Sequence, residues 1–267
     1  MTYLILALFG GLSGMTTVLF GFGGGFVVVP VLYGVLAHSG AGQQAAMHVA
    51  VATSTCVMIV NASLSTRRSA RAGHLLKDWL WPLAGFIALG SLLGALAASF
   101  VSGTALRGAF IVYLAITIVD CLFRHGFVSR SESTEPKRLS RRTVGPGGVV
   151  IGAVATFLGV GGSVMTVPLM RRSGLSMTQA TSMANPLSLP VALVGTATYM
   201  LSGWHASAEL GAAHIGYVDL VAFAVLTIGA WFGMRLAARW VGRIPDALHA
   251  KVYVGLLAVV MLSMMVV

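Results

Sequence analysis

Long apolar runs separated by short polar segments form most of the chain. A helix that spans a bilayer needs about 20 apolar residues, and several runs meet this length. The full spans predicted in this way are 45–66, 79–100, 104–123, 178–201, 216–234 and 249–267. Two further runs, 2–37 and 145–170, carry glycine-rich stretches in their middles. The first would measure roughly 54 Å as one helix, against a hydrocarbon core of about 30 Å. We therefore expect both runs to break at their glycines.

The two glycine-rich stretches are copies of one another. The block GFGGGFVVVP at 21–30 returns as GVGGSVMTVP at 159–168, each inside an apolar run. Such a repeat indicates a duplicated unit, and glycine-rich backbone at membrane depth is tolerated only where protein or a water-filled path surrounds it. Paired interruptions in two halves are the best sequence pointer to the binding site of a transporter. The pattern therefore predicts a transporter built from two units.

The positions of the cationic side chains favour hairpins over full crossings for the two broken runs. If both runs enter and leave on one side, all 17 Lys and Arg residues except Arg107 fall on the cytoplasmic side. If both cross fully, the cations of 171–172 and 235–251 join Arg107 outside, which the positive-inside rule disfavours. A hairpin plus three full spans gives each half an odd number of crossings, so the halves are inverted. A count of ten helices keeps this inversion, whereas eight full crossings would not.

The predicted fold is thus an all-α polytopic membrane protein of two inverted repeats. Each repeat has about four membrane helical segments, the first of which is broken or re-entrant at the glycine motif. We place the N-terminal membrane repeat at 1–123, a basic cytoplasmic linker at 124–144 and the C-terminal membrane repeat at 145–267. The linker reads RHGFVSRSESTEPKRLSRR over 124–142, and a patch on anionic lipid headgroups is its alternative role.

Composition supports a membrane protein and excludes several other classes. With 57% hydrophobic and 9% charged residues, the chain cannot cover a soluble domain with polar surface. The net charge is +10, and the Lys and Arg residues lie in short segments between apolar runs. They therefore indicate which loops face the cytoplasm, and we expect no nucleic-acid partner. Cys56 and Cys121 lie in apolar runs without CxxC spacing, so we expect no disulfide framework, no metal site and no cofactor.

The chemistry of the glycine blocks points to a small anion as the substrate. Glycine lets the backbone adopt positive φ and approach a ligand closely, and a helix that restarts after a break presents unpaired N–H groups and partial positive charge. Two such termini make an anion site without a buried arginine. Hydroxyl and amide groups on the following spans can complete the coordination.

The candidate substrate-binding residues are the glycine blocks and the polar side chains on the spans that follow them. They are Gly21, Gly23, Gly24, Gly25, Thr53, Ser54, Asn61, Gly159, Gly161, Gly162, Ser163, Thr181, Ser182 and Asn185. The alternative for these glycines is close helix packing, which we expect for Gly10, Gly14, Gly90 and Gly94. The alternative for the hydroxyl groups is a bond to their own helix.

Ionisable residues inside the predicted spans are few. His48 is the proton-coupling candidate, because an imidazole ordinarily changes charge near pH ~6.5. Asp120 is expected to pair with Arg124, four residues on. The segment with His205, Glu209, His214 and Asp219 is expected to be a solvated outer loop, and its histidines lack a third well-spaced metal ligand.

Several of these motifs together resemble one known family. The block GFGGGFVVVPVLY, its echo GVGGSVMTVPLM, the stretch HVAVATS at 48–54, the step ATS at 180–182 and the basic linker are similar to the TauE/SafE family of sulfite exporters, also called TSUP. The resemblance covers both halves. It implies a multi-pass carrier of the bacterial inner membrane that exports sulfite or a small organosulfur anion such as sulfoacetate. One departure is Ser163, which stands where the first block has Gly25.

The predicted function is therefore a non-enzymatic transporter whose partners are a small sulfur-containing anion and the lipid bilayer. It would work by alternating access around a midplane site formed by the two helix breaks. A passive anion channel is the nearest alternative. A sulfur relay through Cys56 and Cys121, or an intramembrane enzyme using His48 with Ser54 or Cys56, is a further one. A homodimer is compatible with the sequence, which does not fix the oligomeric state.

Overall fold

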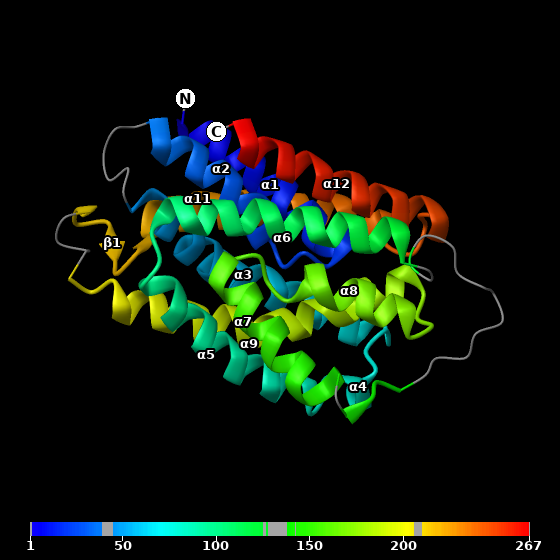
Figure 1. Cartoon of the computed structure of the whole chain (residues 1–267). Coiled ribbons are helices and arrows are strands. Elements are labelled where there is room, and N and C mark those ends of the chain that lie inside the picture. Colours follow the sequence, from blue (N-terminus) through cyan, green and yellow to red (C-terminus); the bar gives the residue numbers. More distant parts are fainter. Residues whose placement is uncertain are drawn as a thin grey trace.

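The structure is a computed structural model that describes residues 2–38, 45–124, 127, 138–141, 143–205 and 210–266. Its first half contains the helices α1 (Thr2–Phe20), α2 (Gly25–His38), α3 (Ala46–Arg71), α4 (Lys77–Leu80), α5 (Leu83–Ser99) and α6 (Gly103–Phe123). Its second half contains η1 (Thr143–Gly147), α7 (Gly148–Leu158), α8 (Ser163–Arg172), α9 (Met177–Ser202), α11 (Leu220–Ala237), η2 (Ala238–Trp240) and α12 (Asp246–Val266). A short antiparallel pair, β1 (His214–Ile215) and β2 (Val218–Asp219), precedes α11. The fold is all-α, as predicted, apart from this pair (Figure 1).

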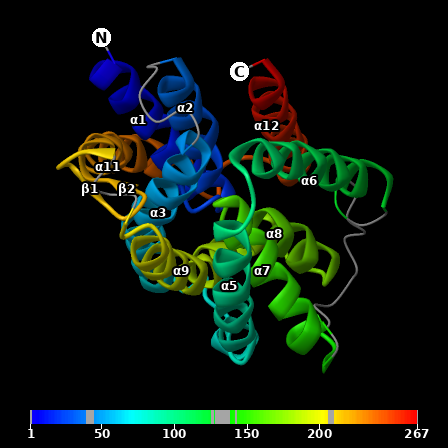
Figure 2. The same cartoon turned by 60° about the vertical axis from the view of Figure 1, so that its left-hand side comes forward.

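Six helical segments of the described residues are long and apolar enough to cross a membrane. They are Thr2–Phe20, Ala46–Arg71, Lys77–Ser99, Gly103–Phe123, Leu220–Trp240 and Asp246–Val266. The predicted span 178–201 is also one helix, α9, but α9 is too polar to belong to this group. Its side chains are mostly buried, and it packs against α3 in the interior of the bundle (Figure 2).

Both glycine-rich runs are broken at their motifs, as the sequence predicts. The first run stops at Phe20 and restarts at Gly25, and the second stops at Leu158 and restarts at Ser163. In the first break, Gly21, Gly23 and Gly24 have φ angles of 75°, 65° and 101°; in the second, Gly159 and Gly161 have φ angles of 69° and 71°. Residues that carry a Cβ atom rarely adopt such positive φ angles, so the breaks need glycine at these positions.

The α1–α2 segment is a hairpin that opens at the end of the molecule where α6 begins, here called the Gly103 end. Helix α1 runs parallel to α11, since Gly10 packs on Leu226 and Gly14 on Ala230. Helix α2 returns toward the start of α6, where the Arg107 guanidinium lies 5.7 Å from the Tyr33 ring centroid. The N-terminus and the end of α2 accordingly lie at the same side of Figure 1.

The α7–α8 segment is a hairpin that opens at the opposite end, here called the Phe123 end, where α6 finishes. Helix α7 runs parallel to α5, with Gly90 against Val149 and Gly94 against Ala153. Helix α8 ends at Arg172, whose guanidinium bonds the Asp120 carboxylate in the last turn of α6 at 2.6 Å. The two hairpins therefore enter the bundle from opposite ends and meet near its centre (Figures 1 and 2).

Helices from one half pack on helices from the other through glycine faces. A Cβ on Gly10, Gly14, Gly90 or Gly94 would overlap backbone atoms of the neighbouring helix. These glycines serve close packing, as expected for small residues at membrane helix interfaces. Because α1 packs on α11 and α5 on α7, neither half forms its own compact unit.

Little of the predicted linker lies within the described residues. Positions 125–126, 128–137 and 142 lie outside them, including Arg130, Lys137 and Arg142. Phe127 is fully buried, lies 5.4 Å from the Tyr253 ring between centroids, and its carbonyl accepts a bond from Arg171 Nε at 3.1 Å. At least one linker residue is thus anchored in the core.

Candidate functional site

The two helix breaks touch each other inside the bundle. A Cβ added to Gly25, the first residue of α2, would overlap the carbonyl oxygen of Gly159, the residue that ends α7. Two facing side chains also lie against both breaks. A Cβ on Gly23 would lie 2.9 Å from Met58 Cγ and 3.5 Å from Ser188 Cβ, and one on Gly161 would lie 2.7 Å from Met58 Sδ and 3.3 Å from Ser188 Oγ. We call this region the break centre. It is formed by the breaks 21–25 and 159–163 with Met58 of α3 and Ser188 of α9.

Helices α3 and α9 hold the breaks in position. Ser54 Oγ of α3 lies 2.9 Å from the Gly159 carbonyl and 2.7 Å from the Val51 carbonyl, both of which accept from it. Gly21 packs directly on the backbone of Thr181 in α9. Each break is therefore fastened by the long interior helix of the opposite half, which makes the centre a product of both halves.

Two asparagines place amide groups beside the first break. Asn61 Nδ2 donates to Ser13 Oγ at 3.4 Å, and Ser13 Oγ in turn donates to the Gly24 carbonyl at 3.0 Å. Asn185 Nδ2 donates to the Thr17 carbonyl at 3.1 Å and to Ser65 Oγ at 2.8 Å. Both asparagines are almost completely buried. Sequence reasoning identified them, but not their partners in α1 and α3.

The helices that restart after the breaks present unpaired backbone donors. Within the described residues, the first N–H of α2 with a backbone acceptor is that of Val28, which bonds Gly24 O at 3.3 Å. In α8 the first are those of Met165 and Thr166, which both bond Gly162 O. The preceding N–H groups of Gly25, Phe26, Ser163 and Val164 are buried and have no such partner among the described residues.

Several buried side-chain atoms near the breaks also lack a partner among the described residues. They are Asn61 Oδ1, Asn185 Oδ1, Ser163 Oγ and Thr166 Oγ1. A buried polar group without a hydrogen bond costs about 1–3 kcal/mol, so such groups gather where a ligand or water completes them. Of these atoms only the two hydroxyl groups can donate, and hydroxyl donors together with bare helix N-termini bind an oxyanion, whereas the two amide oxygens can only accept.

Helix α12 contacts both breaks through residues that sequence reasoning missed. His249 Nε2 donates to the Leu19 carbonyl, in the last turn of α1, at 2.8 Å. Tyr253 OH donates to the carbonyls of Ser163 and Val164, in the first turn of α8, at 3.4 and 3.3 Å. The sequence does show polar side chains within the apolar run of α12, which could have marked them as functional. It does not show that they contact glycine motifs so distant along the chain.

The departure at Ser163 has a steric explanation. Neither Gly25 nor Ser163 needs a left-handed backbone, because each is the first residue of a helix and no positive φ occurs at either. Glycine is required at position 25 because the Gly159 carbonyl occupies the place of a side chain. The second break has room for the Ser163 side chain, so serine is accommodated there without a change in backbone conformation.

Several other candidate residues have contacts that do not point to a substrate role. Thr53 Oγ1 accepts a bond from Asp219 N at 3.0 Å, so it fastens α3 to β2. Thr181 Oγ1 donates to the Thr178 carbonyl of its own helix, and Ser182 is buried with no recorded bond within the described residues. Gly162 has an ordinary helical φ of −68° and no atom within 3.4 Å of a Cβ position.

His48 lies near the Gly103 end rather than at the break centre. Its Nε2 lies 3.2 Å from the Ala98 carbonyl and 3.0 Å from the Val101 carbonyl, so the imidazole caps the end of α5. Met58 is ten residues further along α3, which at 1.5 Å per residue is about 15 Å away. Proton coupling through His48 would thus act on the packing of α3 with α5.

The remaining ionisable residues pair within the fold. Asp120 forms the expected contact with Arg124 at 3.6 Å and a shorter one with Arg172. Asp219 caps α11 by accepting from Val221 N and Ala222 N, each at 2.9 Å, so it does more than face solvent. Glu209 lies outside the described residues.

The rival chemistries find little geometric support. Cys56 and Cys121 are free thiols. His48 bonds the carbonyls of α5, whereas Ser54 Oγ bonds those of Val51 and Gly159, so this histidine and this serine are not paired as base and nucleophile. No group of three or more His, Cys, Asp and Glu side chains that could hold a metal occurs among the described residues.

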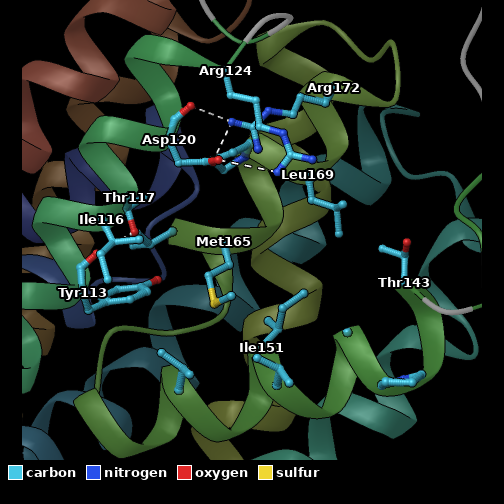
Figure 3. Close-up of a pocket in the computed structure, with 16 residues that line it drawn as sticks. Tyr113, Ile116, Thr117, Asp120, Arg124, Thr143, Ile151, Met165, Leu169 and Arg172 are labelled. Atoms are coloured by element: carbon cyan, nitrogen blue, oxygen red, sulfur yellow. Dashed lines mark hydrogen bonds and ion pairs between the residues drawn. The ribbon is translucent and has the colours of Figure 1, made fainter.

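Two cavities open near the Phe123 end. One, of about 320 Å³, lies between α1, α3 and α11, and its polar lining is Ser65, Arg68, Arg71 and Arg235; we call it the arginine cavity. The other, of about 550 Å³, lies between α6, α7 and α8; we call it the lateral groove. Figure 3 shows its apolar wall, with Ile151, Met165 and Leu169, and the Asp120–Arg124–Arg172 cluster at one end.

Comparison with known proteins agrees with this architecture. The fold of apolar helices around two broken hairpins defines a multi-pass membrane transporter. The profile of the family "Sulfite exporter TauE/SafE" matches residues 6–264, so the chain belongs to the TauE/SafE family. A "Probable membrane transporter protein" of Haemophilus influenzae is 25% identical over 98% of this chain and 98% of its own length.

Two further relatives have similar descriptions. A probable membrane transporter protein of Methanocaldococcus jannaschii is 24% identical, covering 88% of this chain and 85% of the relative. Another of Bacillus subtilis is 26% identical, covering 89% of this chain and 88% of the relative. The similarity extends over both halves of the chain in each case.

Proposed function

We propose that this protein is a secondary transporter that exports sulfite or a small organosulfur anion across the bacterial inner membrane. The observation that carries this proposal is the contact between the two helix breaks, Gly25 against Gly159, with unpaired backbone N–H groups at the start of both α2 and α8 and unpaired hydroxyl groups of Ser163 and Thr166 in α8. A small oxyanion is the ligand that such groups recognise best. The description of the family, sulfite exporter, supports sulfite as the particular oxyanion.

We further propose that the two halves are inverted repeats that alternate access to the break centre. The opposite directions of the α1–α2 and α7–α8 hairpins support this, since each hairpin reaches the centre from its own end. The burial of Phe22, Met58 and Leu187 supports a closed centre and therefore a gated carrier rather than an open pore. Opening would require one hairpin to move with the interior helix that fastens it.

Proton coupling through His48 belongs to this proposal. The imidazole joins α3 to the last carbonyls of α5, and α3 fastens the second break through Ser54. Protonation of His48 would place a charge in this buried contact and alter the packing of α3. Protonation would thus affect transport by changing the packing of α3, without direct contact between His48 and the substrate.

The test is transport in proteoliposomes. The purified protein is reconstituted and the movement of sulfite, sulfoacetate, thiosulfate and sulfate is followed with and without an imposed pH gradient. We expect saturable movement of sulfite or an organosulfur anion and counterflow with unlabelled substrate. Movement of none of the four by folded protein would refute the substrate proposal, whereas non-saturable movement without counterflow would favour the passive channel.

A further inference from the structure

The arginine cavity has a strongly cationic lining. Arg68 and Arg71 come from the last turns of α3, and Arg235 comes from the last turn of α11. None of the residues that line the cavity is acidic. Within the described part of the chain, none of the three guanidinium groups lies within 4.0 Å of a carboxylate. The cavity therefore has positive charge that no carboxylate of the described residues neutralises.

The contacts of these arginines keep their charge at the cavity. Arg68 Nη2 donates to the Ala238 carbonyl at 2.9 Å, which ties α3 to the end of α11. The Arg235 guanidinium lies 3.7 Å from the Trp231 ring centroid, and Trp231 also lines the cavity. Stacking on an indole and a bond to a neutral carbonyl orient a guanidinium without cancelling its charge.

The lateral groove is a useful contrast. Its two arginines, Arg124 and Arg172, both contact the Asp120 carboxylate, and the rest of its wall is largely apolar (Figure 3). A small, strongly hydrated anion gains little from such a lining. Compared with the lateral groove, the arginine cavity is therefore the better match for an oxyanion.

The inner wall of the arginine cavity leads to the first helix break. Ser65 lines the cavity but is only 3% exposed, and its hydroxyl oxygen accepts from Asn185 Nδ2 at 2.8 Å. Within the described residues this hydroxyl has no acceptor for its own proton. Asn185 Nδ2 also donates to the Thr17 carbonyl, which accepts the N–H of Gly21 at 3.0 Å. A chain of hydrogen bonds through Ser65, Asn185 and the Thr17 carbonyl thus connects the cavity wall to the break.

We propose that the arginine cavity is the loading site for the transported oxyanion and that the Ser65–Asn185 hydrogen bond is its closed gate. This inference rests on the proposed function and adds an entry site that lies outside the break centre. The cavity is at the end where the cations concentrate, which the positive-inside rule assigns to the cytoplasm. An anion would be drawn in by the three arginines and pass to the centre when Asn185 releases Ser65.

The experiment compares two double variants of equal charge. Arg68→Gln with Arg235→Gln removes two cavity arginines, whereas Arg67→Gln with Arg239→Gln removes two neighbouring arginines. All four side chains are exposed, but Arg67 and Arg239 do not line the cavity. Sulfite movement is measured from the cytoplasmic face in oriented vesicles, and radiolabelled sulfate binding is measured on purified protein in phosphatidylcholine nanodiscs. The melting temperature of each variant is recorded.

We expect the cavity variant to raise the KM for the cytoplasmic anion about tenfold and to weaken sulfate binding similarly, with kcat and melting temperature close to wild type. Both effects should shrink at high ionic strength. The control variant should behave as wild type. Equal KM and equal sulfate binding in the two double variants would overturn the proposal, even if the protein transports sulfite as proposed.

Two further outcomes separate the sources of failure. Wild-type protein that moves no sulfur anion but binds sulfate through Arg68 and Arg235 would refute the proposed substrate while supporting an anion site in the cavity. Addition of phosphatidylglycerol to the nanodiscs tests the other anion source, a lipid headgroup. Loss of sulfate binding in the anionic lipid, with retention in phosphatidylcholine, would overturn the assignment to a soluble oxyanion.

Discussion

Gly25 and Gly159 are in direct contact, although they belong to different halves of the chain. The contact joins the first residue of α2 to the residue that ends α7, and the Gly159 carbonyl occupies the place where residue 25 would carry a Cβ. The same carbonyl accepts a hydrogen bond from Ser54 Oγ. The two hairpins are thus in van der Waals contact at their helix breaks, where the backbone lacks regular helical hydrogen bonds.

Gly25→Ala should therefore destabilise the fold, whereas Gly162→Ala should not. The alanine methyl at position 25 would overlap the Gly159 carbonyl, and overpacking of this kind costs about 1–3 kcal/mol or more. Position 162 has a helical φ and no neighbour within 3.4 Å of a Cβ. Melting of the detergent-solubilised variants measures the difference. A Gly25→Ala protein as stable as Gly162→Ala would contradict the close contact of the two breaks.

Ser163→Ala and Thr166→Val should weaken substrate binding without loss of stability. The two hydroxyl groups are buried and lack a partner among the described residues, so their removal leaves no broken hydrogen bond in the protein. If they donate to the anion, KM should rise about ten- to a hundredfold for each substitution, because a hydrogen bond to a charged group contributes about 1.5–3 kcal/mol. The KM for sulfite and the melting temperature are measured together, and an unchanged KM would remove α8 from the binding site.

Asp246→Asn should be among the most destabilising single substitutions at an ion pair. Asp246 pairs with Arg171, whose side chain is only 1% exposed, and also accepts from Met177 N at 2.8 Å. Loss of the carboxylate removes the counter-charge of a buried guanidinium, which then keeps only its bonds to the Phe127 and Leu175 carbonyls. Breaking a fully buried pair costs about 3–5 kcal/mol, and the 40% exposure of Asp246 places this loss at or below the lower end.

Asp78→Asn is the control, since the Asp78–Arg138 pair is largely exposed and such pairs contribute about 0–1 kcal/mol. Equal melting temperatures for both variants would mean that Arg171 finds another partner.

His48→Gln should separate transport from its dependence on a pH gradient. A glutamine amide can still donate to the Ala98 or Val101 carbonyl, so we expect uptake without a gradient to stay within about threefold of wild type. Stimulation by an imposed gradient should be lost, because glutamine cannot take up a proton. Retained stimulation would move the coupling role to another group, and His249→Gln is the next variant to measure, since His249 bonds Leu19 beside the first break.

The sequence predicted those parts of the site that follow from local backbone rules. Five break glycines, Gly21, Gly23, Gly24, Gly159 and Gly161, have the positive φ angles that their motif indicated. The polar residues following the motifs were less uniform. Ser54, Asn61 and Asn185 contact residues in or beside the breaks, whereas Thr53 fastens β2 and Thr181 bonds its own helix. Neighbouring hydroxyl residues on one helix face different directions, and the sequence does not say which element each will meet.

The sequence by itself determined the class of protein, the broken segments and the glycine packing faces. These follow from apolar run length, from the φ angles open to glycine and from the absence of a side chain, which are properties of single residues and short stretches. Only the tertiary structure decided that Gly25 meets Gly159 and that Tyr253 bonds the start of α8. Such contacts join segments far apart in sequence, and they depend on how helices pack rather than on any local preference.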